Sequence, residues 1–345
     1  MPINNANWRD SSSCDYQKNI LPELVSKEFL SLIKNATCKK DREALERQVF
    51  FDDAERDVAS VESADPLGEA KHSVTPFLVH QYKNRVLLLS TGKCFSHCRY
   101  CFRKSYTTRP NGFVSKEKIE KVVHYLKAHS NIDEILISGG DPLTASLQEL
   151  SYLLCRLRDI SPNIIFRLCT RAPIFAPSIF SPSLFSILED AKPLWIIPHI
   201  NHIAELGTSQ KSAIKDILRH GIPMQSQTVL LKRINDDASS LVSLFHTLTM
   251  LGIKPGYLFQ LDHAFGTKHF RVPLDKGLKL WEEVREELSG LSTPSFAVDL
   301  MEGGGKFPLS AVGLQHSFFY DGKQTIIKKD CNKTYTYSTL NDIKT

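Results

Sequence analysis

Residues 86–103 read VLLLSTGKCFSHCRYCFR, an apolar run followed by three of the chain's eight cysteines. The run VLLLS has the length and composition of a buried parallel strand. Cys94, Cys98 and Cys101 follow it at intervals of four and three residues, so one loop leaving the strand can bring the three thiols together. Soft thiolates bind zinc or iron–sulfur clusters. The stretch therefore predicts a metal centre at the carboxyl end of a strand.

Two kinds of metal centre are compatible with this spacing. A zinc site would recruit His97 as a fourth ligand beside the three thiolates. Structural zinc sites usually draw their ligands from two separate knuckles, however, and the sequence has no second CxxC and no HxxxH. An iron–sulfur cluster held by three protein thiolates would leave one iron open for a further ligand. The spacing favours the cluster and leaves zinc as the alternative.

Five further apolar runs follow at nearly even intervals. Counted from residue 86, the starts of successive runs are separated by 48, 30, 30, 30 and 32 residues, and amphipathic stretches lie between the runs. About thirty residues is the length of one strand with its crossover helix. We therefore expect an α/β fold, a partial (β/α)6 barrel, with a doubly wound open sheet as the alternative. The runs are EILISGG (134–140), IIFRLCT (164–170), LWIIPHI (194–200), MQSQTVLL (224–231) and GYLFQLD (256–262).

Composition divides the chain into three regions. Residues 1–75 are polar and predict a helical N-terminal region, residues 76–290 contain the barrel units, and residues 291–345 predict a C-terminal lobe. Polar residues or glycines follow almost every apolar run, as in TGKC, SGGDP and HINH. In a parallel α/β barrel the active site forms at the carboxyl-terminal face of the strands. We therefore expect these segments to meet the cysteine loop there.

Charge and hydropathy exclude several classes of protein. The formal charge of +5 is spread along 345 residues without a basic block, so we expect no nucleic-acid partner. The first residues lack the apolar core of a signal peptide, and no uncharged run is long enough to span a bilayer. We therefore expect a cytoplasmic protein without a membrane partner, in a reducing compartment where clustered cysteines bind metal.

The pattern CxxxCxxC, with an aromatic residue before the last cysteine, resembles the radical S-adenosylmethionine (SAM) superfamily. The resemblance implies that Cys94, Cys98 and Cys101 hold a [4Fe-4S] cluster whose open iron chelates the amino and carboxylate groups of SAM. SGGDP resembles the glycine-rich segment that meets the SAM amino group, and HINH and QSQTVLL match other SAM-site segments. The residues implied to bind SAM are Ser138, Gly139, Gly140, Asp141, His199 and Gln227.

CRYCFR, at residues 98–103, is similar to a narrower group, the lysine 2,3-aminomutase family. That family grips the substrate α-carboxylate with the arginine two residues after the last cysteine, here Arg103, and an arginine fork suits bidentate carboxylate binding. The segment DLMEGGGKFP (299–308) matches the one that carries the family's pyridoxal phosphate (PLP) lysine, which would be Lys306. Three glycines before this lysine allow positive φ and a close approach of backbone to cofactor.

Two further pairs of residues complete this resemblance. Asp262 and Asp299 fall on the family positions that hold the distal ε-ammonium group of the substrate, and a desolvated cation needs paired anions. Tyr82 and Arg85, in the run HQYKNRVLLL, fall on the strand that meets the PLP phosphate. Gln81 departs from the family pattern, which often has a basic residue at this position.

The resemblance implies an isomerase, namely a radical-SAM, PLP-dependent 2,3-aminomutase that moves the α-amino group of lysine, or of another basic amino acid, to the β-carbon. It also implies a reductant such as flavodoxin and a homo-oligomer. One branch of the family acts on a lysine of translation elongation factor P, and DPLGEAKHSV and GIKPGYLFQLD resemble that branch, so a protein-bound lysine is an alternative substrate. The cysteine triplet would also fit a non-catalytic metal-binding module or a radical-SAM enzyme without PLP.

Overall fold

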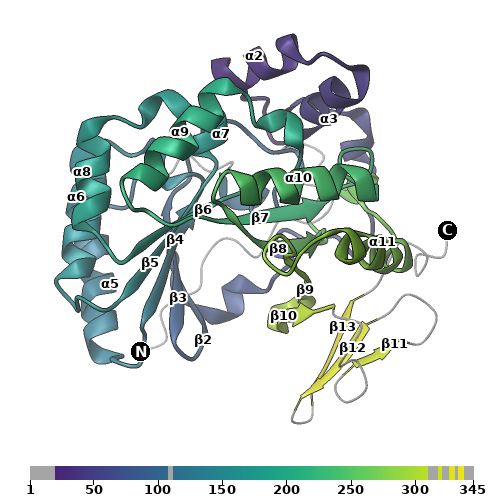
Figure 1. The fold of residues 1–345 in the computed structure, drawn as a ribbon. Helices are drawn as coiled ribbons and strands as arrows, with labels where there is room; N and C mark the ends of the chain where they lie inside the picture. The colour runs from purple at the N-terminus through teal and green to yellow at the C-terminus, as the bar shows by residue number, and fades with distance from the viewer. Residues whose placement is uncertain (1–19, 108–111, 310–317, 321–325, 331–332, 338–345) are drawn as a thin grey trace.

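The computed structural model describes residues 20–107, 112–309, 318–320, 326–330 and 333–337. At its centre lies a curved sheet of parallel strands, with helices packed around its outer side (Figure 1). The parallel strands are β3 (Arg85–Thr91), β4 (Glu134–Gly139), β5 (Ile165–Thr170), β6 (Leu194–Pro198), β7 (Gln225–Leu230), β8 (Lys254–Gln260) and β9 (Ser295–Leu300).

The parallel strands follow one another in chain order. Parallel pairing joins β3 through β6 and β7 through β9, and isolated parallel bridges from Ile196 to Met224 and from His199 to Gln227 link β6 to β7. A doubly wound sheet would instead reverse its strand order at a switch point. The expected partial barrel is therefore confirmed, and each of the six predicted runs forms a strand. β9 extends the parallel sheet beyond them.

Antiparallel strands flank this sheet at both edges. β1 and β2 pair ahead of β3, and β10 pairs with β9. A separate antiparallel sheet, yellow in Figure 1, follows toward the C-terminus. Because β9 pairs with β8, the strand that precedes Lys306 is part of the barrel sheet, and the division of the chain at residues 75 and 290 stays a prediction. These strands are β1 (Ser73–Thr75), β2 (Leu78–Tyr82), β10 (Gly305–Pro308), β11 (Phe318–Tyr320), β12 (Ile326–Asp330) and β13 (Lys333–Tyr337).

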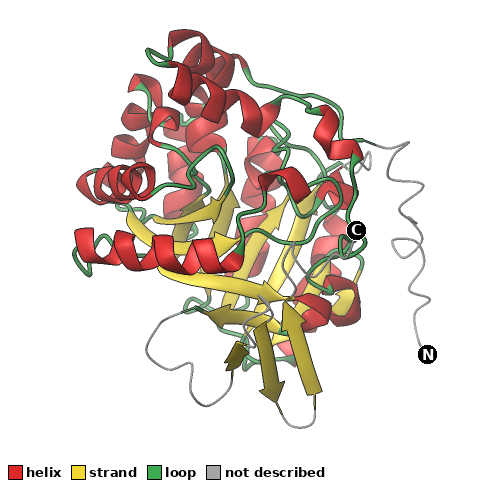
Figure 2. Cartoon of the chain, turned by 90° about the vertical axis from the view of Figure 1, so that its right-hand side faces the viewer, coloured by secondary structure: helices red, strands yellow, loops and turns green. Residues whose placement is uncertain are grey.

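Helices cover the outer face of the sheet, and several of them begin with a side-chain cap (Figure 2). In α6, the Ser146 side chain accepts from the Glu149 backbone while the Glu149 side chain reaches back to Ser146, which satisfies two unpaired N–H groups. Leu153 and Leu157 of this helix are fully buried against the sheet. The helices are α2 (Lys27–Asn35), α3 (Lys39–Val49), α4 (Lys104–Thr107), α5 (Lys116–Ala128), α6 (Leu147–Arg158), α7 (Ala172–Phe175), α8 (Pro182–Asp190), α9 (Thr208–Arg219), α10 (Ala238–Met250) and α11 (Leu274–Glu287).

Short 3-10 helices occupy several of the loops between these elements, and two of them, η1 and η2, belong to the N-terminal region. No helix in the described ranges is long and apolar enough to cross a membrane. The 3-10 helices are η1 (Asp53–Arg56), η2 (Glu69–His72), η3 (Pro142–Thr144), η4 (Pro177–Ile179), η5 (Ile203–Glu205), η6 (Lys268–Phe270) and η7 (Met301–Gly303).

Successive residues of each strand face opposite sides of the sheet. In β4, Ile135 and Ile137 are fully buried in the main core, and the residue between them is half-buried. In β8 and β9, the half-buried alternate positions are Tyr257, Phe259 and Asp299. The side of the sheet opposite the helices therefore receives aromatic and acidic side chains from these last strands.

Candidate active site

The three predicted cluster cysteines lie on the loop that leaves β3. Burial, helped by neighbouring thiols, raises the pKa of Cys94, and burial together with Cys98 raises the pKa of Cys101 to about 11. The thiolates of Cys94 and Cys101 are therefore costly to form when no cation is near. A bound metal reverses this, because a coordinating thiol is deprotonated outright. The donor set fits an iron–sulfur cluster.

A site for a single metal ion fits less well. Across the part of the chain that the structure describes, no three His, Cys, Asp or Glu side chains converge on one ion position. His97, the fourth ligand in the zinc alternative, has its Nδ1 2.7 Å from the backbone oxygen of Pro22. In a [4Fe-4S] cluster each cysteine binds a different iron, so the thiols lie farther apart than the ligands of one ion. The described residues therefore do not form a site for a single ion, and the cluster stays the prediction.

The N-terminal region anchors the cysteine loop. Arg99, between the second and third cysteines, donates from Nε and Nη2 to the two carboxylate oxygens of Glu55, both at 2.7 Å, and from Nη1 to the backbone oxygen of Leu21. The Arg99 and Glu55 side chains are fully buried. In addition, the Ser26 backbone donates to the Ser96 hydroxyl. The loop is thus held by buried charge-assisted hydrogen bonds.

The glycines after β4 let that segment pack directly on the start of the cysteine loop. Gly139 has φ +124°, and a Cβ on Gly140 would lie 2.1 Å from the backbone oxygen of Lys93. The Gly140 and Asp141 backbone N–H groups donate to the oxygens of Thr91 and Lys93, both at 2.6 Å. The segment implied to meet SAM is therefore adjacent to the cysteine loop, and only glycine fits at residue 140.

The Asp141 side chain links β4 to β5. Its carboxylate accepts from the Thr170 hydroxyl at 2.7 and 2.9 Å, from the Arg171 backbone at 2.8 Å and from the Leu143 backbone at 3.0 Å. Burial raises its pKa to about 6. These contacts use the carboxylate to hold the strand ends in place, so any contact of this segment with SAM would come from other atoms.

Arg171 is a residue that the sequence analysis did not select. Its guanidinium donates to the Cys98 Sγ at 2.9 Å and to the Tyr100 hydroxyl at 2.6 Å, and its other nitrogen donates to Glu205 at 2.6 Å. In the sequence, its position directly after the apolar run IIFRLCT indicated a polar residue at the carboxyl end of a strand. No local pattern marked Glu205, which lies 34 residues further along the chain.

His199 and Gln227, implied to belong to the SAM site, are joined by the parallel bridge between β6 and β7. The His199 Nε2 lies 3.1 Å from the Asn201 side-chain oxygen. Burial and the nearby Arg171 cation lower the pKa of His199 to about 3, so its ring is neutral at physiological pH. The ring packs edge-on against Tyr100, at 5.5 Å between centroids. His199 therefore lies beside the cysteine loop, and Gln227 is bridged to His199.

Arg103, predicted to bind a carboxylate, binds one in this structure. Its Nε and Nη2 donate to the two oxygens of Glu69 at 3.1 and 2.5 Å, and its Nη1 lies 3.4 Å from the Ser138 hydroxyl. Glu69 comes from η2 and is 34 residues away in sequence, with no local pattern to reveal it. The Arg103 fork thus has the bidentate geometry that carboxylate recognition needs.

Lys306 and Asp299 are cross-strand partners on β10 and β9. The Lys306 ammonium donates to both Asp299 oxygens, at 3.1 and 2.9 Å, and lies 3.9 Å from the centre of the Phe259 ring. A cation over an aromatic face is stabilised by the ring quadrupole. The Lys306 backbone N–H donates to the Tyr82 hydroxyl at 3.1 Å, which ties β10 to β2.

Asp262 is coupled electrostatically to both of these groups of charges. Burial and the Asp299 carboxylate raise its pKa to about 8, while Lys306 and Arg103 act in the opposite direction. The charges of Asp299, Lys306 and Arg103 all act on the Asp262 carboxyl group. The structure therefore gathers Arg103, Asp262, Asp299 and Lys306 into one site at the carboxyl ends of the strands.

The residues expected to meet a phosphate lie beside Lys306. The Arg85 guanidinium stacks 3.7 Å from the centre of the Tyr82 ring, and burial raises the pKa of Tyr82. Gln81 donates from Nε2 to the backbone oxygen of Gly303 at 3.1 Å. Gln81, at a position where the family often has a basic residue, thus holds the glycine-rich segment that precedes Lys306. Gly305, with φ +76°, could not carry a side chain without strain.

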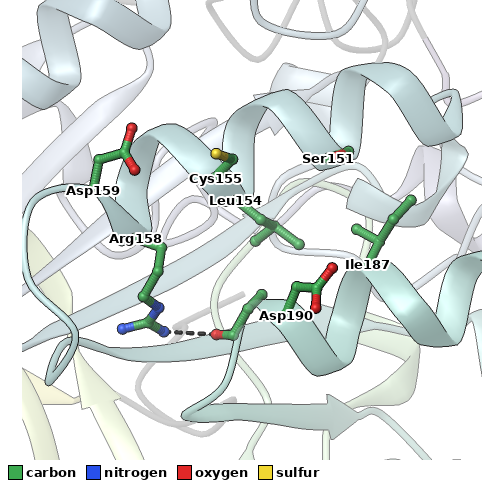
Figure 3. Close-up of a pocket in the computed structure, with 8 residues that line it drawn as sticks. Ser151, Leu154, Cys155, Arg158, Asp159, Ile187 and Asp190 are labelled. Atoms are coloured by element: carbon green, nitrogen blue, oxygen red, sulfur yellow. Dashed lines mark hydrogen bonds between the residues drawn. The ribbon is translucent and has the colours of Figure 1, made fainter.

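A cavity of about 200 Å³ on the outer side of the barrel is separate from this site. It lies between α6 and α8 and contains Cys155, Arg158 and Asp190 in its lining (Figure 3). The Arg158 guanidinium is engaged with backbone oxygens, including that of Ala191 at 2.6 Å. None of the predicted site residues contributes to it.

Comparison with known proteins gives one family match and three similar proteins. A protein-family model described as "Radical SAM superfamily" matches residues 88–244. A protein of Treponema pallidum (strain Nichols), provisionally named L-lysine 2,3-aminomutase, is 53% identical over 308 residues, 89% of this chain and 86% of that protein. The L-lysine 2,3-aminomutase of Fusobacterium nucleatum is 36% identical over 71% of this chain and 58% of its own length. The glutamate 2,3-aminomutase of Clostridioides difficile is 32% identical over 72% of this chain and 59% of its own length.

Proposed function

This chain belongs to the lysine 2,3-aminomutase family of radical SAM enzymes, and from that premise we propose that it moves the α-amino group of a basic amino acid to the β-carbon with the help of PLP. We take free lysine as the first substrate. A reductant such as flavodoxin and a homo-oligomeric state stay predictions from the family.

The family implies a [4Fe-4S] cluster and SAM, and we propose which residues of this chain hold them. Cys94, Cys98 and Cys101 would ligate the cluster, and the segment after β4 would meet SAM. Lys306 would attach PLP, with Tyr82 and Arg85 at its phosphate. When bound, the cluster and SAM supply a carbon radical that removes hydrogen, and PLP supplies an electron sink. The further residues assigned to SAM are Ser138, Gly139, Gly140, Asp141, His199 and Gln227.

The protein's own task is to hold the substrate at both ends. We propose that Arg103 binds the α-carboxylate and that Asp262 and Asp299 bind the distal ammonium group. The observation that carries this proposal is the contact between Asp299 and Lys306, because an alkylammonium group already lies within 3.1 Å of both carboxylate oxygens. A lysine substrate presents the same chemical group to the same acceptor.

The electrostatics favour a basic amino acid over an acidic one. Burial and the Asp299 carboxylate already raise the pKa of Asp262, so a further carboxylate from a glutamate side chain would add negative charge where one carboxylate already disfavours another. An ammonium group would instead stabilise both carboxylates in their ionised form. The aromatic rings of Tyr257 and Phe259 close this end of the site with apolar surface.

The experiment that tests this function is anaerobic incubation of the reconstituted enzyme with SAM, a reductant and PLP. Lysine, arginine, glutamate and elongation factor P are supplied in separate reactions, and products are identified by mass and NMR. We expect lysine to give the 3-amino isomer, with arginine slower and glutamate inert. Preference for glutamate would contradict the roles of Asp262 and Asp299. Activity on elongation factor P alone would keep the reaction and move the substrate to a protein-bound lysine.

A further inference from the structure

Arg103 presents two separate binding edges, and the chain itself uses one of them. A guanidinium is a planar fork with five N–H donors. Glu69 occupies the edge formed by Nε and Nη2, at 3.1 and 2.5 Å, while Nη1 lies on the side of Ser138, at 3.4 Å. The edge formed by Nη1 and Nη2 carries hydrogens that Glu69 does not use. A ligand carboxylate can therefore bind Arg103 there while Glu69 stays in place.

Glu69 is held firmly in this position. The Asp65 carboxylate accepts from the backbone N–H groups of Glu69 and Ala70, both at 2.9 Å. Gly68, with φ +66°, packs closely on the glycine-rich segment that precedes Lys306. A Cβ on Gly68 would lie 2.6 Å from the Gly303 nitrogen. Glu69 itself is 7% exposed. Its carboxylate is therefore a fixed part of the site.

Glu69 also changes the charge that an incoming ligand meets. The Arg103 cation is balanced by Glu69 before any ligand binds, and the two side chains are only 16% and 9% exposed, so water screens them poorly. A ligand that brings a bare carboxylate adds an uncompensated negative charge beside Glu69. A ligand that also brings a cationic nitrogen on the adjacent carbon compensates that charge locally.

We propose that Glu69 makes the Arg103 site selective for α-amino acids, because it penalises carboxylates that lack a neighbouring cationic nitrogen. The inference rests on the proposed function, in which Arg103 binds the substrate α-carboxylate. Glu69 is then a specificity-determining residue, which acts through charge beside Arg103 and the α-nitrogen of the ligand.

Lysine and 6-aminohexanoate form the matched pair of ligands that tests this, because they differ only in the α-amino group. Their dissociation constants are measured by calorimetry on the cluster- and PLP-loaded enzyme without SAM, so that no turnover occurs. Any covalent contribution of PLP to lysine binding is common to all variants and cancels when the ratios are compared. We expect Glu69→Gln to lower the preference for lysine about tenfold, mainly by tightening 6-aminohexanoate. Glu69→Asp, which keeps the charge, should retain most of the preference.

Two controls make the result specific. Lys71→Gln removes the exposed ion pair with Glu302 from the same segment, and it should leave the ratio unchanged. Glu69→Ala is a second neutral variant. If circular dichroism shows that Glu69→Gln is poorly folded, the ratio of dissociation constants is measured on Glu69→Ala instead. A ratio that stays at the wild-type value in the neutral variants, with both ligands bound equally tighter or equally weaker, overturns the inference.

Failure of the underlying assignment would look different. Arg103→Met should weaken lysine and 6-aminohexanoate together, because both lose their carboxylate partner. If Arg103→Met leaves both dissociation constants unchanged, Arg103 does not hold the carboxylate, and the proposed function is wrong at this residue. If Arg103→Met weakens both ligands while the neutral Glu69 variants keep the wild-type ratio, only the role of Glu69 is refuted.

Discussion

Lys306 and Asp299 face each other across β10 and β9, with the lysine ammonium 2.9 and 3.1 Å from the two carboxylate oxygens. The proposed function assigns that carboxylate to the substrate ammonium and that lysine to PLP. A lysine engaged with a cofactor would release the carboxylate, so attachment of PLP and binding of a basic substrate are compatible at the same pair of residues.

Lys306 is expected to be the lysine that attaches PLP. Borohydride reduction followed by peptide mapping should place the phosphopyridoxyl group on Lys306. Lys306→Arg keeps a cation beside Asp299 but cannot form the covalent link, so it should fold with a melting temperature near that of the wild type and lose the label. Labelling of a different lysine would refute the assignment.

The cysteine triplet is expected to hold one [4Fe-4S] cluster. Anaerobic reconstitution should give about four iron and four sulfide per chain, and replacement of Cys94, Cys98 and Cys101 by alanine should leave almost none. The exposed Cys155, on the outer face of α6, provides the matched control, because Cys155→Ala should keep the full iron content. Stoichiometric zinc in place of iron would contradict the cluster.

Gly140→Ala is expected to disrupt the packing of the β4 end on the cysteine loop. Its Cβ would lie 2.1 Å from the Lys93 backbone oxygen, so backbone has to move. We expect a loss of about 3 kcal/mol or more in the free energy of unfolding, at the upper end for overpacked sites, together with lower iron content. Gly290→Ala, where no atom lies within 4 Å of the new Cβ, should change neither quantity. Equal stability of the two variants would show that the contact is not tight.

Glu55→Ala is expected to weaken the anchor of the cysteine loop. It leaves the fully buried Arg99 guanidinium without its carboxylate partner, which typically costs about 3–5 kcal/mol of unfolding free energy. The control is Asp53→Ala, which removes an exposed ion pair with Arg56 and should stay within about 0.5 kcal/mol of the wild type. Chemical denaturation measures both. A small effect of Glu55→Ala would mean that the loop is held by its other contacts.

Asp262 is expected to make stability depend on pH. Its pKa is about 8 in the folded protein against an ordinary value of 3.8, so the folded state holds a proton that the unfolded state has lost between those values. The free energy of unfolding should therefore fall as pH rises from about 4 to 8. Asp262→Asn should remove this contribution and be the more stable protein at pH 9, on the order of 1–3 kcal/mol, because Asp299 shares the titration.

The same substitution should also weaken lysine turnover about ten- to a hundredfold, since one charge-assisted hydrogen bond is lost. Iron content and bound PLP should stay at wild-type levels, because neither is assigned to this carboxylate. If stability shows the same pH dependence in Asp262→Asn as in the wild type, another group is responsible for it.

The sequence alone determined the elements and the cluster motif. Regularly spaced apolar runs predicted the barrel strands, because a buried parallel strand and its crossover helix leave a period of about thirty residues. The spacing of Cys94, Cys98 and Cys101 indicated the cluster, because ligands on a single loop are close in sequence. In the same way, the resemblance of short segments singled out Arg103 and Lys306 as candidate site residues, and their roles stay predictions.

Only the tertiary structure revealed the partners of these residues. Glu69 and Arg103 are 34 residues apart and Glu55 and Arg99 are 44 apart, and in each pair the glutamate lies in a 3-10 helix while the arginine lies on the cysteine loop. An ion pair between residues so far apart in sequence produces no pattern in the sequence, because each residue taken alone resembles an ordinary exposed charged residue. The pairing of β9 with β8, which brings Asp299 and Lys306 to the barrel, was decided likewise by hydrogen bonds between strands rather than by any local pattern.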